Sequence, residues 1–454
     1  MANSCPVPVS SLLSSSSSPI TPRLHYLLSG TFNTLWMYLL AFSPHSSPPT
    51  LSISKKYRAE GPHQYLALNH DRSRVYATTW AQPPSLSSWE VLDGGSAGIT
   101  RVNTVPISAT GSYLSVLPSS ISSSLSLSPS SGARVFQAGG PVAQTFAVDA
   151  ATGGFGEQLQ EVIYLDGGEQ ELWDDKTDRT RVALRYGSHA VDVDPVLGRA
   201  YVPHVGRDSI YVYSFNPDGT LHQLAEVPSH GHRGHEGVRH SVPSRDGSKL
   251  YVVTEHTSYL DVYTVHRHAP YLTHSQRLSV IPVSLAPLRL QYRGDTLRLS
   301  SDGRRLYVTT RGKTPRERGW VSVWKVADDG SIDESESDRS SSSSRESQEE
   351  ETGYGALSRF ETPTSGGKAN AIEVCPFHVH VAPPYDPTAT ATVAAVDGQD
   401  FVVLTDDEQG WVWVLEWRDE WNELRQVAGV QLGRQDGADE DESETGASHA
   451  VWLS

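Results

Sequence analysis

A polar segment of eight residues that ends in a tyrosine occurs four times in the chain. The copies are Asn69–Tyr76, Asp194–Tyr201, Ser244–Tyr251 and Ser300–Tyr307. A short run of β-forming residues, such as Val252-Val253-Thr254, follows each tyrosine. Polar turns between runs of this kind are typical of β-hairpins. The segment therefore predicts the turn and the second strand of a repeated β unit.

The spacing of the tyrosines predicts propeller blades. The last two intervals are 50 and 56 residues, and the first is 125. Without the Ser-rich run Ser115–Gly132 the first interval is 107 residues, or two units, which predicts a degenerate copy near Arg134–Gln137. A sixth copy runs from Asn370–Val374 to Phe401–Leu404 across a Pro/Ala/Thr-rich insertion. β-Rich repeats of about 40–50 residues are typical of propellers.

The two ends of the chain together predict a seventh unit. The tetrapeptide Ser-His-Ala-Val occurs at 188–191 and again at 448–451, but no second strand follows the later copy. Leu24–Ser29 and Leu35–Phe42 have the pattern of the missing strands. We therefore expect an all-β fold, a seven-bladed β-propeller over residues 24–454, in which both termini close one blade.

The negative charge is concentrated in two segments. Asp328–Glu351 has ten acids and two arginines, Gly433–Gly446 has six acids and one arginine, and together they hold −13 of the net charge of −16. Segments of this composition bury little apolar area. We expect disorder near 328–352 and 433–446, in the Ser-rich insert near 115–132 and in the Ser/Pro-rich residues 1–23. The acidity argues against nucleic acid as a partner.

Nothing in the sequence predicts secretion or a membrane span. Residues 1–23 lack the apolar core of a secretory signal. Leu24–Phe42 is apolar, but small and polar residues interrupt it, so a strand pair explains it better than a span does. The two cysteines, Cys5 and Cys375, form neither a disulfide framework nor a metal-ligand spacing, which fits a reducing compartment. We therefore expect a cytoplasmic protein.

Ionisable side chains recur at two fixed positions of the repeat. Twelve residues before the tyrosine stand Gln64, His189, Arg239 and Asp295, and four residues after it stand Trp80, Val205, Glu255 and Arg311. In a blade the innermost strand begins, and the second strand ends, on the same face. We therefore expect four of these side chains to converge at one channel mouth as catalytic residues: His189, Arg239, Glu255 and Arg311. Arg239 and Arg311 should also bind substrate, with Asn370 and His449 as further contacts.

This set of side chains suits an anionic substrate. Arginine meets carboxylates with a planar, two-pronged fork, so two arginines imply a substrate with two or three carboxylates. Histidine transfers protons near neutral pH. A glutamate beside arginine is an orienting partner or a second acid–base group. Polar residues also line propeller channels without any chemistry, and a structural role is the alternative.

Two other polar clusters favour structural roles. His230, His232, His235 and His240 lie in or next to a glycine-rich loop and lack the spacing of ligands on a regular element, so a solvated loop is favoured over a metal site. Asp406–Glu408 lies in a predicted β-turn, where acids are common. We expect no metal, and we find no nucleophilic Ser or Cys motif and no phosphate-binding loop.

Several motifs resemble those of a known family. They are Thr362–Ala371, Leu404–Trp411, Glu416–Glu420, Leu24–Thr31 and Ala450–Trp452. In these motifs, and from residue 24 onward outside the inserts, the chain resembles the fungal 3-carboxy-cis,cis-muconate cyclases. The resemblance implies a seven-bladed lactonizing enzyme of protocatechuate (β-ketoadipate) catabolism that needs no cofactor. More broadly, the chain is similar to the propeller superfamily that includes 6-phosphogluconolactonases.

The resemblance also implies a site. The family is thought to use a histidine, two arginines and a glutamate, which here fall on His189, Arg239, Arg311 and Glu255. Three positions depart from the family pattern: Ala190 replaces a glycine, His240 an aromatic residue and Lys368 a histidine. The implied reaction is a cycloisomerisation, in which one carboxylate adds across a conjugated double bond to give a lactone. A lactone hydrolase and a non-catalytic scaffold are the alternatives.

The expected partner is therefore a small polycarboxylate substrate. A second copy of the chain is left open, and neither nucleic acid nor a membrane is expected.

Overall fold

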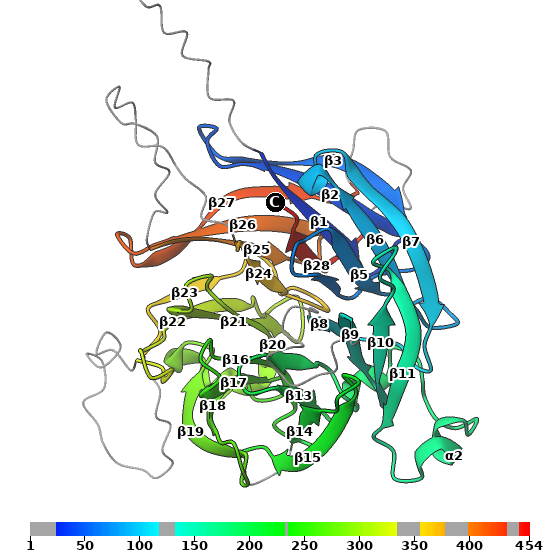
Figure 1. Cartoon of the computed structure of the whole chain (residues 1–454). Coiled ribbons are helices and arrows are strands. Elements are labelled where there is room, and N and C mark those ends of the chain that lie inside the picture. Colours follow the sequence, from blue (N-terminus) through cyan, green and yellow to red (C-terminus); the bar gives the residue numbers. More distant parts are fainter. Residues whose placement is uncertain (1–23, 118–131, 232–234, 334–354, 377–397, 434–444) are drawn as a thin grey trace, which may run out of the picture.

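The described residues form a ring of blades. The computed structural model describes residues 24–117, 132–231, 235–333, 355–376, 398–433 and 445–454. In this part of the chain, seven four-stranded antiparallel sheets surround a common axis (Figure 1). The predicted all-β, seven-bladed propeller is confirmed. No helix of these ranges is long and apolar enough to cross a membrane.

Six blades are continuous in sequence and run from the innermost strand outward. The first three are β4 (Leu66–Leu68), β5 (Arg74–Thr78), β6 (Ser85–Leu92) and β7 (Gly98–Pro106); β8 (Tyr113–Leu117), β9 (Arg134–Gly139), β10 (Val142–Val148) and β11 (Phe155–Ile163); and β12 (Asp192–Asp194), β13 (Arg199–His204), β14 (Ser209–Phe215) and β15 (Leu221–Pro228). The next three are β16 (Val238–Pro243), β17 (Lys249–Thr254), β18 (Tyr259–Val265) and β19 (Leu272–Ser279); β20 (Tyr292–Leu299), β21 (Arg305–Gly312), β22 (Trp320–Lys325) and β23 (Ser358–Glu361); and β24 (Ile372–Val374), β25 (Gln399–Thr405), β26 (Trp411–Arg418) and β27 (Glu423–Gln431). The helical segments lie in the connections and are η1 (Asp93–Gly95), α2 (Gly168–Leu172), η2 (Ala183–Arg185) and η3 (Val283–Gln291).

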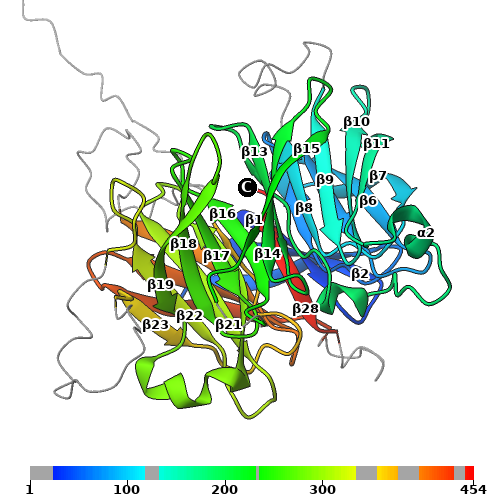
Figure 2. The ribbon, with the colours of Figure 1, turned by 90° about the horizontal axis from the view of Figure 1, so that it is seen from below.

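The seventh blade joins the two ends of the chain. Its strands, from the axis outward, are β28 (Ala447–Trp452), β1 (His25–Thr31), β2 (Trp36–Ser43) and β3 (Thr50–Arg58). β1 pairs with β2 on one side and with β28 on the other, where Leu28 lies opposite Val451. Figure 2 shows β28 in the middle of the molecule and α2 at its edge. The apolar run Leu24–Phe42 is thus a strand pair, as expected.

The repeated tyrosines link neighbouring blades. Tyr76, Tyr251 and Tyr307 are almost fully buried, and each hydroxyl donates a hydrogen bond to the next blade. The acceptors are the carbonyl of Gly153 at 2.7 Å, the carbonyl of Gly330 at 2.6 Å and the carboxylate of Asp400 at 2.6 Å. Because a buried hydroxyl needs a partner, the tyrosine provides both core packing and a link between blades in these three blades. The hydroxyl of the fourth tyrosine, Tyr201, is buried and makes no such bond in the described residues. The predicted copies near Arg134–Gln137 and Phe401–Leu404 form β9 and β25, the second strands of their blades.

The inserts begin and end differently from the prediction. Ser115–Leu117 forms the end of β8, so the first insert is shorter than the composition indicates. In the first acidic segment Ile332 is buried and bridges Val326, so Asp328–Asp333 is an ordered turn of its blade. The other residues of the predicted disordered segments lie outside the described ranges, except at the edges of the segments, and so do residues 1–23.

Candidate active site

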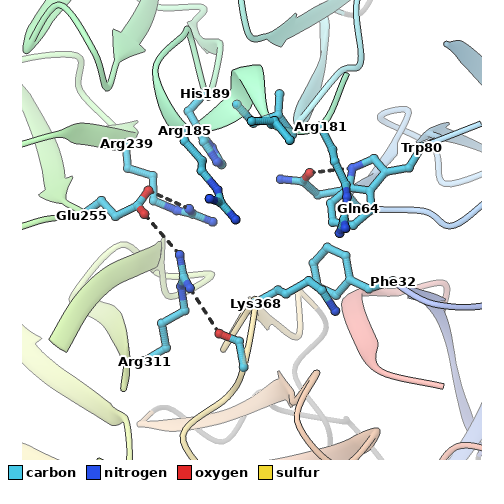
Figure 3. Close-up of a pocket in the computed structure, with 13 residues that line it drawn as sticks. Phe32, Gln64, Trp80, Arg181, Arg185, His189, Arg239, Glu255, Arg311 and Lys368 are labelled. Carbon is cyan, nitrogen blue, oxygen red and sulfur yellow. Dashed lines mark hydrogen bonds and ion pairs between the residues drawn. The ribbon is translucent and has the colours of Figure 1, made fainter. Parts of the chain in front are cut away.

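A pocket of about 200 Å³ opens where inner strands begin and second strands end (Figure 3). Its lining includes all four predicted catalytic residues, His189, Arg239, Glu255 and Arg311. Gln64 and Trp80, from the same repeat positions of another blade, also line it, and the Trp80 indole donates a hydrogen bond to Gln64 at 2.9 Å. The repeat therefore brings these positions together as predicted. The volume lies below the roughly 300–1,000 Å³ of drug-sized ligand sites, which suits a small substrate.

Glu255 is the centre of a buried charge cluster. Its carboxylate accepts hydrogen bonds from Arg239 at 3.1 Å, Arg293 at 2.7 Å and Arg311 at 3.2 Å. Arg239 also contacts Asp295, through its carbonyl at 3.1 Å and its carboxylate at 2.6 Å. Three cations around one carboxylate hold each guanidinium in a fixed direction.

A glycine allows the two blades of this cluster to approach. The backbone N–H of Gly294 donates to the carbonyl of Glu255 at 3.0 Å. A Cβ at position 294 would lie 2.1 Å from the carbonyl oxygen of Thr254, which is far inside van der Waals contact. Glycine at this position therefore lets β20 bring Arg293 and Asp295 against Glu255 and Arg239.

The electrostatics of the cluster fix the charge of Glu255. Burial alone would raise the pKa of this carboxyl group, but the charges of Arg239 and Arg311 outweigh burial and hold the pKa well below its usual range. Glu255 is therefore an anion at neutral pH. This excludes a proton-donating role and favours the predicted role as the partner of the arginines.

His189 is buried beside a second histidine. Its Nδ1 lies 3.2 Å from Nε2 of His240, a residue of β16. Burial, together with the positive charge of Arg239, holds the pKa of His189 well below its ordinary value, so these surroundings favour the neutral imidazole. With Nδ1 engaged, Nε2 is the ring nitrogen of His189 available to a substrate.

Asn370 and His449 lie outside the pocket lining. The Asn370 amide donates to the carbonyl of Thr310 at 2.9 Å. The His449 ring stacks on Tyr65, with 4.1 Å between centroids, and its Nδ1 accepts the N–H of Leu66 at 3.3 Å. Both side chains are buried, and we leave them out of the candidate site.

Four lining or supporting cations were not predicted as site residues. Arg181 and Arg185 come from the connection between β11 and β12, which is not part of the repeat, and Lys368 comes from the segment before β24. Arg293 has a signal in the sequence, since it stands two residues before Asp295 and the period of a strand places both on one face. Lys368 is held by Asp407 at 2.9 Å.

The other polar clusters have structural contacts. No group of three or more His, Cys, Asp or Glu side chains could hold a metal ion in the described ranges. The His230 ring stacks on His274 at 3.5 Å between centroids, and His232 lies outside the described residues. Asp406 accepts the backbone N–H groups of Glu408 and Gln409 at 3.0 and 2.9 Å, which confirms the predicted turn.

The comparisons with known proteins agree with this architecture. Residues 141–348 match the profile of a family described as "Lactonase, 7-bladed beta-propeller". The structure of the periplasmic gluconolactonase of Pseudomonas aeruginosa overlays with a TM-score of 0.63 at 16% identity, over 95% of this chain and 99% of that chain. A likeness at this identity shows the fold alone. The chain is thus a seven-bladed β-propeller that is similar to the lactonase propellers over residues 141–348.

The chain is also similar in sequence to two muconate enzymes. The chain is 28% identical over 403 residues to Muconate cycloisomerase 1 of Cutaneotrichosporon cutaneum, over 87% of this chain and 91% of that protein. It is 22% identical over 253 residues to the Carboxy-cis,cis-muconate cyclase of Neurospora crassa, over 54% of this chain and 57% of that protein. The second relative carries the name of the cyclase family that the motifs resemble, and its match covers about half of this chain.

Proposed function

We propose that this protein is a cycloisomerase that converts 3-carboxy-cis,cis-muconate to a carboxymuconolactone in aromatic catabolism through protocatechuate and β-ketoadipate. The observation that carries the proposal is a small pocket lined by five cationic side chains and one anionic side chain, with a buried histidine beside them. A small pocket in which cationic side chains outnumber anionic ones suits a short substrate with several carboxylates. The names of the two relatives, both muconate enzymes, support the same substrate class.

The reaction joins two parts of one molecule. A carboxylate oxygen of the substrate forms a C–O bond to one carbon of the conjugated double bond, and the π electrons move to the neighbouring carbon and its own carboxylate. No group leaves, so the product is an isomer of the substrate. Because nucleophile and acceptor are already linked, the enzyme has to fold the substrate and stabilise charge. Arg239 and Arg311, held by Glu255, are the groups we assign to that negative charge.

His189 is the group we assign to proton delivery. A neutral imidazole would become an imidazolate if it gave up a proton, so the donor must be the imidazolium. Burial and Arg239 by themselves disfavour that form. A bound polycarboxylate brings negative charge next to the ring and favours it again. The N–H on Nδ1 then donates to Nε2 of His240, which lies 3.2 Å away, and Nε2 of His189 gives its proton to the substrate carbon.

The test is an assay with two readouts. Purified protein is mixed with 3-carboxy-cis,cis-muconate, and the ultraviolet absorption of the conjugated diene and the mass of the product are followed. We expect the diene absorption to disappear while the mass stays unchanged. Hydrolysis of a sugar lactone without muconate turnover would instead support a lactone hydrolase. A folded protein that turns over neither compound would support a non-catalytic scaffold.

A further inference from the structure

Two arginines in the pocket lining have no counter-charge in the described part of the chain. Arg181 and Arg185 both line the pocket, and Figure 3 shows both side chains pointing into it. Among the residues that the structure describes, neither guanidinium forms an ion pair or a hydrogen bond, whereas Arg239 and Arg311 share Glu255 and Lys368 is paired with Asp407. Arg181 and Arg185 are therefore the pocket cations that have no carboxylate partner among the described residues.

The segment that carries these arginines is held in place. It connects β11 to β12 and contains α2 and η2. Leu172 of α2 is buried against Ala109 and Val142, and Leu184 of η2 is buried beside the pocket. The backbone of the segment is held by a hydrogen bond, in which the carbonyl of Arg179 accepts the N–H of Thr110 at 2.9 Å. These contacts fix the positions from which the two arginines reach the pocket.

Aromatic contact positions one of the two side chains. The Arg181 guanidinium lies over the Trp80 ring, 5.1 Å from its centroid. Trp80 is itself held by the hydrogen bond from its indole N–H to Gln64. A guanidinium stacked on a ring keeps its N–H edge free for an anion. Arg185 comes from the same segment, four residues after Arg181.

We propose that Arg181 and Arg185 bind a third carboxylate of the substrate and make the site selective for tricarboxylates over dicarboxylates. This rests on the proposed function, and it deepens it by naming the residues that select the substrate. Arg239 and Arg311 are already assigned to the negative charge that develops during ring closure. A dicarboxylate leaves Arg181 and Arg185 without a partner, whereas a tricarboxylate completes the charge of the pocket.

The first test compares two substrates in matched variants. Arg181→Gln, Arg185→Gln and the double variant are assayed with 3-carboxy-cis,cis-muconate and with cis,cis-muconate at one low ionic strength. The control is Arg179→Gln, on the same segment, whose guanidinium stacks on Trp173 at 4.5 Å outside the lining. We expect each pocket variant to lose about tenfold in kcat/KM for the tricarboxylate, or about 1.4 kcal/mol, mainly through KM. Activity with the dicarboxylate should change less than threefold, and the control should change neither.

The second test measures binding without turnover. Propane-1,2,3-tricarboxylate and glutarate share one carbon chain and differ by a single carboxylate. We expect calorimetry to show tighter binding of the tricarboxylate by about tenfold or more, and we expect the double variant to lose this preference. If the wild type isomerises no muconate but shows the preference, the proposed function fails and this inference stands. Equal losses for both substrates, or a preference that survives in a folded double variant, would overturn it.

Discussion

The two mouths of the channel contain similar residues with different charge balance. The mouth opposite the candidate site has the larger cavity, about 370 Å³, and is lined by Arg298, Glu373, Asp192, Tyr65 and Tyr113. Arg298 is paired with Glu373 at 2.7 Å and also donates to Tyr65, and Asp192 accepts the Tyr113 hydroxyl at 2.7 Å. At the candidate site, Arg181 and Arg185 stay unpaired in the described residues. Uncompensated charge, rather than cavity size, thus distinguishes the site from the opposite mouth.

The identical tetrapeptides at 188–191 and 448–451 show how neighbouring blades create this difference. His189 lines the pocket and contacts His240 of the next blade. The His449 ring instead stacks on Tyr65, which precedes the inner strand of the adjacent blade, and its Nε2 lies 3.6 Å from a carboxylate oxygen of Glu373. Position in the blade is the same for both histidines, and the residues of the adjacent blades decide which of them is available to a substrate.

The largest effect on activity is expected from His189→Ala, with His449→Ala as the comparison. His189→Ala should lower kcat by about 10²–10⁴, the range of general acid–base catalysis, because no other proton donor is assigned at the pocket. His449→Ala should keep kcat within a few-fold and lower stability, since it removes a buried stacking partner. Steady-state kinetics and thermal unfolding of both variants are the measurements. Near wild-type turnover in a folded His189→Ala protein would refute the proton-donor role.

The next comparison concerns the two buried glutamates. Glu255→Gln should cost about 3–5 kcal/mol of unfolding free energy, because it leaves buried arginines without their counter-charge, and should abolish most activity. Glu373→Gln should cost less, about 1–3 kcal/mol, and leave activity intact. Denaturant unfolding and kinetics check both. Equal activity in the two variants would remove the distinction between the two mouths.

The pKa of Glu373 predicts how the stability of the fold changes at low pH. Burial would raise the pKa of Glu373, but the charge of Arg298 outweighs burial and lowers the pKa from 4.5 to about 2. A depressed folded-state pKa means that the stabilisation is present above pH 4.5 and is lost as the pH falls toward 2. Glu373→Gln should therefore lose less stability than the wild type over that range.

The sequence predicted the blades and the Glu255 cluster because both depend on periodic positions. A strand start and a strand end recur at fixed distances from the tyrosine, so equivalent positions share a face. Arg181 and Arg185 could not be found this way, since their segment belongs to no repeat. The position of His449 outside the pocket lining could not be predicted, because its local sequence is identical to that of His189 and the difference is made by Tyr65 and His240, far away in the chain.

Asp192 at the opposite mouth should affect stability alone. Burial raises the pKa of its carboxyl group from 3.8 to about 6, so the stability that depends on the protonated form is complete below pH 3.8 and is lost as the pH rises through 6. At about 1.4 kcal/mol per pKa unit this amounts to about 2–3 kcal/mol. Asp192→Asn should remove this pH dependence and leave kcat/KM unchanged. Denaturant unfolding at pH 4 and pH 8 measures it, and an unaltered pH dependence would contradict it.

The smallest effect is expected at His240, which separates a positioning role from a structural one. Its Nε2 lies 3.2 Å from Nδ1 of His189. In the proposed mechanism it accepts a hydrogen bond from the imidazolium of His189, and such a bond favours the charged form. His240→Phe keeps an aromatic ring but removes the acceptor, so the pKa of His189 in the complex should fall. Because kcat needs the imidazolium, its decline with rising pH should then begin at lower pH, with a loss of about tenfold at neutral pH.

Tyr113→Phe is the matched control, because the Tyr113 ring packs edge-on against His240 at 5.1 Å between centroids but offers His189 no acceptor. It should leave the pH profile of kcat unchanged. If His240→Phe and Tyr113→Phe lower kcat equally at every pH, His240 only fills space. A pH profile that shifts in His240→Phe but not in Tyr113→Phe would show that His240, which does not stand at one of the repeat positions, sets the pKa of His189.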